Sequence, residues 1–188
     1  MADTMERKFY LRQFKSISHA ISTYENLNLL ISHIAEGVSR TFGIKGCSVL
    51  LYDEREKQLF MASSYGISDT YLNKGPIMVD DKHSVIRVGK PVYIADMQND
   101  PRVQYPKAAE EENLACMMSI PIRCREAVTG VLRMYHGESL LLNEDDIDAL
   151  CVLTEQLGVV IENNGLRNFL DGLKQAMENL PLRLLKGL

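Results

Sequence analysis

Two pairs of strand-like runs constrain the fold of this chain more than any other feature. Residues 47–52 and 59–65 are short, apolar and rich in β-favouring side chains, and the polar stretch 53–56 separates them. Residues 116–124 and 128–136 form a second pair with an even shorter connection. Each pair predicts an antiparallel hairpin, because a connection this short can only reverse the chain.

Amphipathic helical patterns precede the first pair and follow the second. Residues 27–42 place apolar side chains at helical intervals, and Gly43 then ends this helix as a left-handed cap. A long helix is predicted after Asn143, whose side chain caps the helix start, and the acidic residues 144–146 suit its positive end. Strands separated in this way by helices and loops predict an α+β domain with an antiparallel sheet.

Both ends of the chain carry further helical patterns. Apolar residues near the N-terminus repeat at intervals of four and three, as in a coiled-coil seam: Tyr10, Phe14, Ile17, Ile21 and Tyr24. This stripe fits a helix packed on its own domain or one helix of a dimer interface. After residues 163–165 the apolar pattern changes phase, so the helix should cover the sheet first and then extend outward, until Pro181 kinks or ends it. We therefore divide the chain into an N-terminal helix (1–26), a domain (27–166) and a C-terminal helical extension (167–188).

The middle of the chain, residues 67–115, is irregular and dense in turn signals such as Gly75-Pro76 and Asn99-Asp100-Pro101. Short helices are predicted at 69–73, 83–88 and 107–113, and a brief strand at 92–94. A long irregular excursion inside a compact domain is often a binding loop or a lid.

The composition bounds the class of protein. The chain has 188 residues, of which 46% are hydrophobic, which is enough for one packed domain. The net charge of −4 argues against a nucleic-acid-binding protein, which is usually basic. No apolar run approaches the roughly 20 residues that span a bilayer, and the charged N-terminus lacks a signal core. We expect a cytoplasmic protein without nucleic-acid or membrane partners.

No group of residues predicts catalysis or a metal site. The cysteines Cys47, Cys116, Cys124 and Cys151 are scattered, without the spacing of a zinc site, and are expected to be reduced and mostly buried. The sequence contains no Ser/His/Asp grouping, no paired catalytic carboxylates and no phosphate-binding glycine loop. We predict that the chain is not an enzyme, and the sequence names no cofactor.

Five segments follow one another in an informative order. They are the turn from Ile94-Ala95-Asp96 to Arg102, the strand Ser119-Ile120-Pro121-Ile122, the run Gly130-Val131-Leu132, the helix start 142–146 and the segment 161–166. In this order and spacing they resemble GAF domains, which are small-molecule sensor and dimer modules of signalling proteins, over about residues 27–166. The resemblance implies a central antiparallel sheet with the N- and C-terminal helices on one face. On the other face, it implies a ligand pocket roofed by the irregular middle segment.

The chain departs from three subclasses of that family. Asn73-Lys74 occurs, but the Phe and Asp-Glu that complete the cyclic-nucleotide signature of phosphodiesterase members do not follow. Bilin-binding members need a Cys near a His in the pocket region, and no His neighbours Cys116 in the sequence. Free methionine sulfoxide reductases of this fold use clustered cysteines. Cys116 and Cys124 share a strand face but lie far apart along it, so they do not look like that set.

The candidate ligand site follows from the second strand pair. If a two-residue loop joins the strands, residue 125 pairs with residue 128. One strand face then carries Met118, Ile120, Ile122, Val131, Arg133 and Tyr135. Arg133 interrupts an apolar strand, so its guanidinium needs an anionic ligand, a carboxylate of the domain, or water at a sheet edge. Tyr135 would stack on a ligand or hydrogen-bond to it, or else fill the core.

Three more residues complete the predicted site. Ser63 and Tyr65 end the first strand pair and would reach the pocket mouth, or else be ordinary strand surface. Asp96 follows a short strand, and we expect its side chain chiefly to accept backbone N–H bonds and shape the loop. Arg102 is expected to pair with a nearby acid and fix the same loop.

The leading hypothesis is a stand-alone GAF sensor that binds an unidentified small molecule between the sheet and residues 67–115. It would act as a homodimer and signal through its terminal helices to a partner protein. The alternative is a ligand-free dimerisation or protein-interaction module whose pocket is filled by its own side chains. A redox enzyme of the free methionine sulfoxide reductase type is the third hypothesis.

Overall fold

A computed structural model describes His19, residues 26–79 and residues 83–178, and all structural statements concern these residues. In chain order the elements are α2 (Leu27–Phe42), β1 (Gly46–Asp53), β2 (Gln58–Tyr65), α3 (Asp69–Leu72), β3 (Ile77–Met78), α4 (Val85–Val88), β4 (Val92–Ile94), α5 (Pro106–Glu111), β5 (Cys116–Cys124), β6 (Ala127–His136) and α6 (Glu144–Glu178). The strands form one antiparallel sheet in the order β3-β2-β1-β6-β5-β4.

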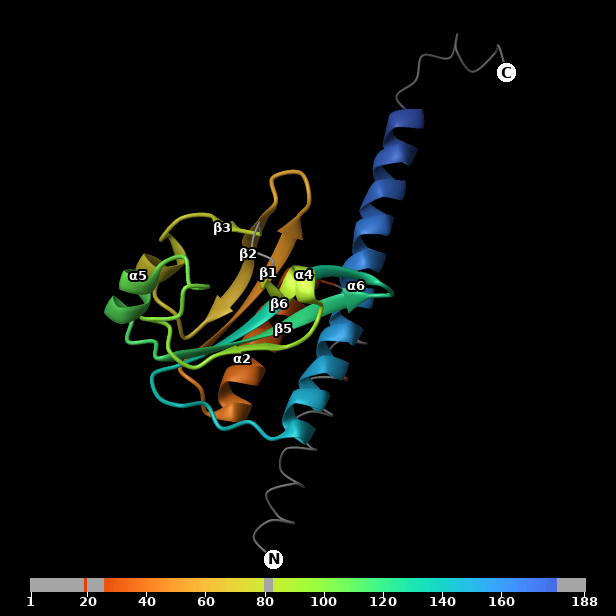
Figure 1. Ribbon diagram of the computed structural model, residues 1–188. Helices are drawn as coiled ribbons and strands as arrows, with labels where there is room; N and C mark the ends of the chain where they lie inside the picture. Colours follow the sequence, from red (N-terminus) through yellow and green to blue (C-terminus); the bar gives the residue numbers. More distant parts are fainter. Residues whose placement is uncertain (1–18, 20–25, 80–82, 179–188) are drawn as a thin grey trace, which may run out of the picture.

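Both predicted hairpins are present, and they lie side by side in the sheet (Figure 1). β1 pairs with β2, β5 pairs with β6, and the pairing of β1 with β6 joins the two hairpins at the centre of the sheet. β6 is therefore a central strand. A side chain on it is surrounded by neighbours on both sides rather than exposed at a sheet edge.

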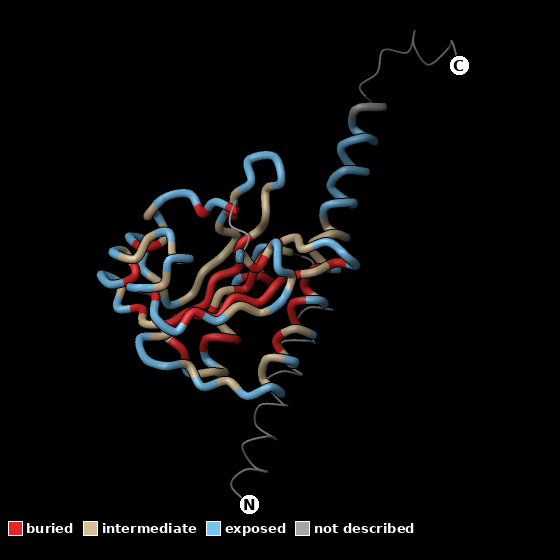
Figure 2. The backbone as a smooth tube through the Cα atoms, viewed as in Figure 1, coloured by how far each residue is buried: buried red, intermediate tan, exposed pale blue. Residues whose placement is uncertain are grey.

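Two helices cover one face of the sheet, which confirms the predicted fold class. α2 begins at Asn26, whose side chain accepts hydrogen bonds from the N–H groups of Asn28 and Leu29. Gly43 caps the end of the helix with a left-handed φ of 59°. The side chains of α2 and of the first half of α6 pack with the sheet in the largest apolar core. Figure 2 shows this buried layer along the strands and along the adjoining part of α6.

α6 is one helix of 35 residues, and it does two different things along its length. Asn143 accepts a hydrogen bond from the N–H of Asp146, as predicted for the cap, and Asp146 accepts one from the N–H of Asn143. The helix buries Leu150, Leu153 and Leu157 against the sheet. Beyond residue 162 its described side chains are exposed or nearly so, and the helix extends away from the domain, as predicted (Figures 1 and 2).

The predictions at the chain ends fall mostly outside the described residues. The N-terminal stripe and Pro181 both belong to this undescribed part of the chain. Among the described helices, none combines the length and the apolar character needed to cross a membrane.

The middle segment covers the opposite face of the sheet. We call its described residues, 67–79 and 83–115, the roof. The predicted short helices correspond to α3, α4 and α5, and the predicted strand to β4, whereas the two-residue strand β3 was not predicted. Two smaller apolar cores lie between roof and sheet, one around Tyr71 and Tyr135, the other around Val79, Val85 and Val131. The domain thus has three layers: helices, sheet and roof.

The predicted strand register is wrong in one respect that matters for the site. The loop does contain two residues, but Cys124 pairs with Ala127, and a bulge then leaves Thr129 without a partner. Because each shift by one residue exchanges the two faces of a strand, Met118 and Ile120 lie opposite Met134 and Leu132 rather than beside Arg133. They belong to the core beneath the helices.

Candidate functional site

Arg133 lies on the roof side of the sheet, in the middle of a row of serines. The cross-strand pairs run from Ser64 on β2 to Ser48 on β1, Arg133 on β6 and Ser119 on β5. Directly paired residues project from the same face, so these hydroxyls flank the guanidinium. Ser48 and Ser119 are buried, and Ser48 Oγ lies 3.1 Å from Ser64 Oγ. A polar strip therefore crosses an otherwise apolar layer.

Two aromatic rings and a lysine stand over one side of this strip. Tyr135 is fully buried and meets the ring of Tyr71 edge-on, with 5.8 Å between centroids and 79° between planes. The Lys74 ammonium lies 3.7 Å from the centroid of the Tyr71 ring and donates a hydrogen bond of 3.0 Å to the Tyr71 carbonyl. α3 thus places an aromatic ring and a cation above the sheet strand that carries Arg133.

Small cavities lie on both sides of Arg133. One of about 50 Å³ extends toward α4, and one of about 40 Å³ extends toward α3. Arg133, Arg102, Gln104 and Met117 line both of them. A water needs roughly 10–15 Å³ of such volume, so each cavity holds a few waters or a group of similar size. No Asp or Glu among the described residues lines either cavity.

Two buried polar atoms of this region have no hydrogen-bond partner among the described residues. They are Nε of Arg133 and Oγ of Ser84, both of which line the cavity on the α4 side. Ser84 precedes α4 but makes no side-chain cap bond to it. An unpaired buried donor costs about 1–3 kcal/mol, and more when it is charged. Among the described residues, these two groups therefore remain available to hydrogen-bond a bound molecule.

The charges in the site act on one another. Burial, and secondarily the charge of Arg133, lower the pKa of Lys74 to about 8, although the carboxylate of Glu112 opposes this shift. Burial raises the pKa of Tyr135, while the charge of Arg133 and a hydrogen bond from it act in the opposite direction. The charge of Arg133 therefore acts on both Lys74 and Tyr135.

Side-chain bonds to backbone groups hold the roof together. Gln104 pairs with the edge strand β3 through both polar atoms of its side-chain amide. Its oxygen accepts from Met78 N at 3.0 Å, and its nitrogen donates to Met78 O at 2.7 Å. Tyr105 donates to the carbonyl of Pro76 at 2.7 Å. These bonds join the segment before α5 to the strand after α3, and both segments line the cavity beside Arg133.

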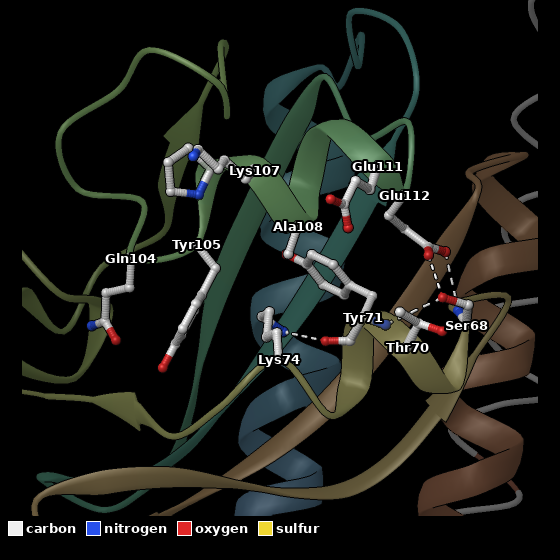
Figure 3. A pocket seen from close by; sticks show the side chains of 11 residues that line it. Ser68, Thr70, Tyr71, Lys74, Gln104, Tyr105, Lys107, Ala108, Glu111 and Glu112 are labelled. Atoms are coloured by element: carbon white, nitrogen blue, oxygen red, sulfur yellow. Dashed lines mark hydrogen bonds between the residues drawn. The ribbon is translucent and has the colours of Figure 1, made fainter.

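Glu112, at the end of α5, connects the roof to the sheet. It accepts hydrogen bonds from the N–H and the hydroxyl of Ser68, the cap of α3 (Figure 3). The ammonium of Lys45, the residue before β1, lies 3.9 Å from the same carboxylate. An outer groove of about 780 Å³ lies between α3 and α5. Tyr71, Lys74, Gln104 and Tyr105 line both this groove and the inner cavity, so they form the wall between them.

The structure brings together only part of the predicted site. Arg133 and Tyr135 lie on the roof face, in contact with each other. Ser63 lies on the helix face, where its hydroxyl is 2.9 Å from that of Ser32 in α2. Tyr65 lies there too, with the guanidinium of Arg40 5.7 Å from its ring centroid.

Asp96 and Arg102 take the structural roles predicted for them. The Asp96 carboxylate accepts from the N–H groups of Gln98 and Asn99, at 3.0 and 3.1 Å, and is exposed. Arg102 binds Asp100 through two nitrogens. These interactions fix the turn after β4, which borders the roof. A ligand contact by Asp96 stays a prediction.

Sequence reasoning missed Lys74, Ser84 and the flanking serines. Lys74 appears in the sequence only as part of an incomplete signature, and its position above Arg133 depends on how the roof folds. The serine row has a weak signal, because Ser48 and Ser119 are the polar residues of apolar strands. A correct register would have placed both beside Arg133.

Cys116 has a histidine neighbour that the sequence does not show. It pairs directly with His136 across the β5–β6 ladder, and its thiol lies 2.9 Å from the carbonyl oxygen of Glu138. Both residues face the helix side, at the end of the sheet away from Cys124. Within the described part of the chain, no three His, Cys, Asp or Glu side chains converge as metal ligands.

Comparison with known proteins identifies relatives of this architecture. A family model described as GAF domain matches residues 25–162. The GAF domain of an Acinetobacter phosphoenolpyruvate-protein phosphotransferase superposes with a TM-score of 0.72 at 21% identity, covering 83% of this chain and 94% of that one. That of the Coxiella burnetii phosphotransferase (ptsP) gives 0.72 at 17% identity, covering 85% and 96%.

A third similar structure is an enzyme. The free methionine-R-sulfoxide reductase of Neisseria meningitidis, in complex with its substrate, gives a TM-score of 0.66 at 18% identity, covering 81% of this chain and 88% of that one. At these identities the likeness shows the fold alone. No curated protein sequence matches the chain significantly.

Proposed function

This chain belongs to the GAF domain family, and we propose that it is a sensory domain that binds a small anionic molecule between sheet and roof. The family is generally sensory and regulatory. One observation carries the anionic character of the ligand: the Arg133 guanidinium is part-buried at the junction of two cavities, and its Nε is unpartnered among the described residues. We propose a non-enzymatic, cytoplasmic protein.

The energetics support an anion at this place. A buried cation without a partner is destabilising, and a carboxylate or phosphate that accepts hydrogen bonds from it offsets that cost. The hydroxyls of Ser119 and Ser84 line the same cavity and can donate to an anion that Arg133 holds. Tyr135 is fully buried against Tyr71 and lines neither cavity, so it fills the core. Arg133 is therefore the predicted site residue that we retain as a ligand contact.

A continuous set of contacts runs from this site to α6. Ser84 and Val85, at the start of α4, line the cavity beside Arg133. At the end of α4, the carbonyl of Gly89 accepts a hydrogen bond from the Arg123 side chain. The backbone of Arg123 in turn lies against Gly158 of α6. A ligand that draws the roof toward Arg133 would thereby favour one position of α6, which is a shift between two arrangements.

The exposed face of α6 supports a homodimer as the signalling unit. Exposed apolar side chains repeat on it at seven-residue intervals: Val152, Val159, Leu166 and Leu173. This spacing is that of one position in a coiled-coil heptad. The stripe lies opposite the face that packs on the sheet, so two copies can pair along it without disturbing the domain core. We propose that the dimer passes the change at α6 to a partner protein.

Native mass spectrometry of the full chain purified from cytoplasm tests the ligand. We expect a non-covalent anionic mass on the wild type, and its loss in Arg133→Met, which keeps the side-chain volume and removes the charge. Arg55→Met, in the exposed β1–β2 turn, is the matched control and should keep the ligand. A bound mass that persists in Arg133→Met would contradict the site.

A second control concerns the chain's own carboxylates. Asp80 and Asp81 lie outside the described residues, between the lining residues Val79 and His83 in the sequence. Under our proposal, the double change Asp80→Asn and Asp81→Asn leaves the ligand bound. If an anion binds only to this double variant, a carboxylate of Asp80 or Asp81 is the partner of Arg133, and the proposal fails.

One observation favours the ligand-free interaction module as a second candidate. Tyr71, Met117 and Tyr135 fill much of the space between sheet and roof, and the remaining cavities are small. That module predicts a dimer in sedimentation experiments with no bound mass and no effect of Arg133→Met on partner binding. The sensor predicts that the same change abolishes a ligand-dependent difference in partner binding.

A further inference from the structure

Lys74 stands at the boundary between the outer groove and the inner cavity, and its partners are uncharged. Its ammonium contacts the Tyr71 ring and the Tyr71 carbonyl, as Figure 3 shows for the hydrogen bond. No ion pair joins Lys74 to a carboxylate among the described residues. Glu112 lies near enough to act on its charge, but the oxygens of that carboxylate are engaged by Ser68.

Lys74 and Arg133 face the same cavity of about 40 Å³ from opposite layers, one from the roof and one from the sheet. Arg102 lines this cavity too, but its guanidinium is bonded to the Asp100 carboxylate. No ion pair among the described residues compensates Lys74 or Arg133, and two positive charges in one small, partly dry space repel each other. A single group with two negative charges would satisfy both, whereas a singly charged group would leave one of them uncompensated. The volume suits a few waters or one group with the size of a tetrahedral oxyanion.

We propose that the anionic group of the ligand is a dianion of phosphoryl size, bound between Arg133 of the sheet and Lys74 of the roof. This inference rests on the proposed function and deepens it, because it assigns a second charged contact and the charge of the ligand. Lys74 closes the roof over a ligand that Arg133 anchors. Because the ligand would then bond to both the sheet and the roof, closure of the roof would depend on the ligand.

The outer groove indicates where the rest of such a ligand lies. Four residues separate the groove from the cavity, and the rings of Tyr71 and Tyr105 are among them. A phosphate monoester with its phosphoryl group in the cavity and its organic part in the groove of about 780 Å³ would have to part the side chains of this wall. Free orthophosphate would use the cavity alone. The experiment below distinguishes the two sources.

Lys74 gives the site a measurable pH dependence. The titratable and charged groups around it are Tyr71 on α3, Arg133 on β6, Arg102 after β4, and Tyr105, Lys107, Glu111 and Glu112 on and beside α5. Burial, and then the charge of Arg133, lower the pKa of Lys74 to about 8, against the opposing charge of Glu112. A dianion binds the charged form, so its affinity should be full below this pKa and fall as pH rises through it.

Titration with sulfate, observed at the Nε–H resonances of the arginine side chains by NMR, tests the proposal. Sulfate keeps two negative charges across the range used, so any pH effect comes from the protein. Between about pH 7 and about pH 9 the wild-type affinity should fall about tenfold, as expected for one group with a pKa near 8. Lys74→Arg should bind at both pH values without this change, and Lys74→Gln should bind more than tenfold more weakly at the lower pH.

The outcomes separate this inference from the proposed function. If Lys74→Gln binds sulfate as the wild type does, or if the wild type binds it equally at both pH values, Lys74 is not a contact and the inference is overturned. The proposed function would stand even then if the wild type binds an organic monoanion and Arg133→Met does not. Phenyl phosphate binding tighter than orthophosphate would identify a monoester as the source, and equal affinities would identify the free ion.

Discussion

The close approach of α6 to the sheet at Gly158 makes a sharp prediction about a single methyl group. A Cβ added at Gly158 would lie 1.9 Å from the carbonyl oxygen of Arg123 and 2.4 Å from its carbonyl carbon. Both atoms belong to the main chain of β5, so no side chain can rotate away to make room. Gly158→Ala must therefore push the helix off the strand or distort one of them.

The magnitude follows from two opposing effects. Elsewhere in a helix, replacing Gly by Ala stabilises by about 1 kcal/mol. Overpacking a core typically costs 1–3 kcal/mol, and a clash between two main chains belongs near the upper end, about 3 kcal/mol. We expect Gly158→Ala to destabilise the domain by about 2 kcal/mol. Gly165→Ala, in the same helix with no atom within 4 Å of the added Cβ, should instead stabilise by up to about 1 kcal/mol.

Urea unfolding followed by circular dichroism measures both changes in one assay. The two variants should differ by about 3 kcal/mol in the free energy of unfolding, with similar denaturant dependence. Gly158→Ala proving as stable as Gly165→Ala would refute the packing of α6 on β5. It would also remove the last link in the proposed path from the roof to the outer helix.

Three further predictions concern the roof and the outer helix. Burial raises the pKa of Glu112, but the hydrogen bonds from Ser68 and nearby lysine charges outweigh it and hold the pKa below its usual value. The stability that Glu112 contributes is therefore present above the unfolded-state pKa of about 4.3 and is lost as pH falls through the folded-state pKa. Because Glu112→Gln has no such contribution to lose, its melting temperature should fall less steeply in acid than that of the wild type. Tyr105→Phe removes the hydrogen bond to Pro76 and should cost about 0.5–1.5 kcal/mol, with faster hydrogen exchange in the roof. Leu166→Asp places a charge on the exposed stripe and should shift a dimer to monomer in sedimentation without lowering the melting temperature of the domain.

The order of the strands and helices could be predicted because each element carries a local signal. α2 was predicted with its correct bounds, since its apolar spacing and the left-handed Gly43 both mark them. Both hairpins follow from short polar connections between apolar runs. β3 has only two residues, which pair with the first two residues of β2, so no periodicity could reveal it.

The faces of the strands were predicted less well, because a bulge changes the alternation and leaves little trace in the sequence. Thr129 is the extra residue in the β5–β6 ladder, and it exchanged the faces assigned to Met118 and Ile120. A second bulge, at Ala62 in β2, lies just before Ser63. The alternation of side chains within each strand was predicted correctly. Which face each side chain occupies depended on the two bulge residues, whose positions are set by the pairing of the assembled sheet.

The site could be predicted where it depends on one strand and could not where it depends on contacts between layers. Arg133 was identifiable because a charge in an apolar central strand needs a partner. Lys74 was not, because its importance arises from meeting Arg133 across a cavity, which requires both the sheet and the roof. Residues whose role depends on two layers leave no pattern along the chain.

Arg123 shows why a signal from this site would leave through one part of α6. Its side chain is bonded to the end of α4 in the roof, while its backbone is packed against α6 on the other face of the sheet. A single residue thus touches both outer layers. The bulge at Thr129 interrupts the β5–β6 ladder beside Arg123, so a displacement of the roof would reach α6 through the backbone of Arg123 itself. Because α6 is largely exposed beyond residue 162, movement at Gly158 is opposed by few contacts farther along the helix. A small displacement of the roof at Arg123 should therefore reorient the outer half of α6 more than an equal displacement near Leu150 would. At Leu150 the helix is buried against the core, and its packing resists movement.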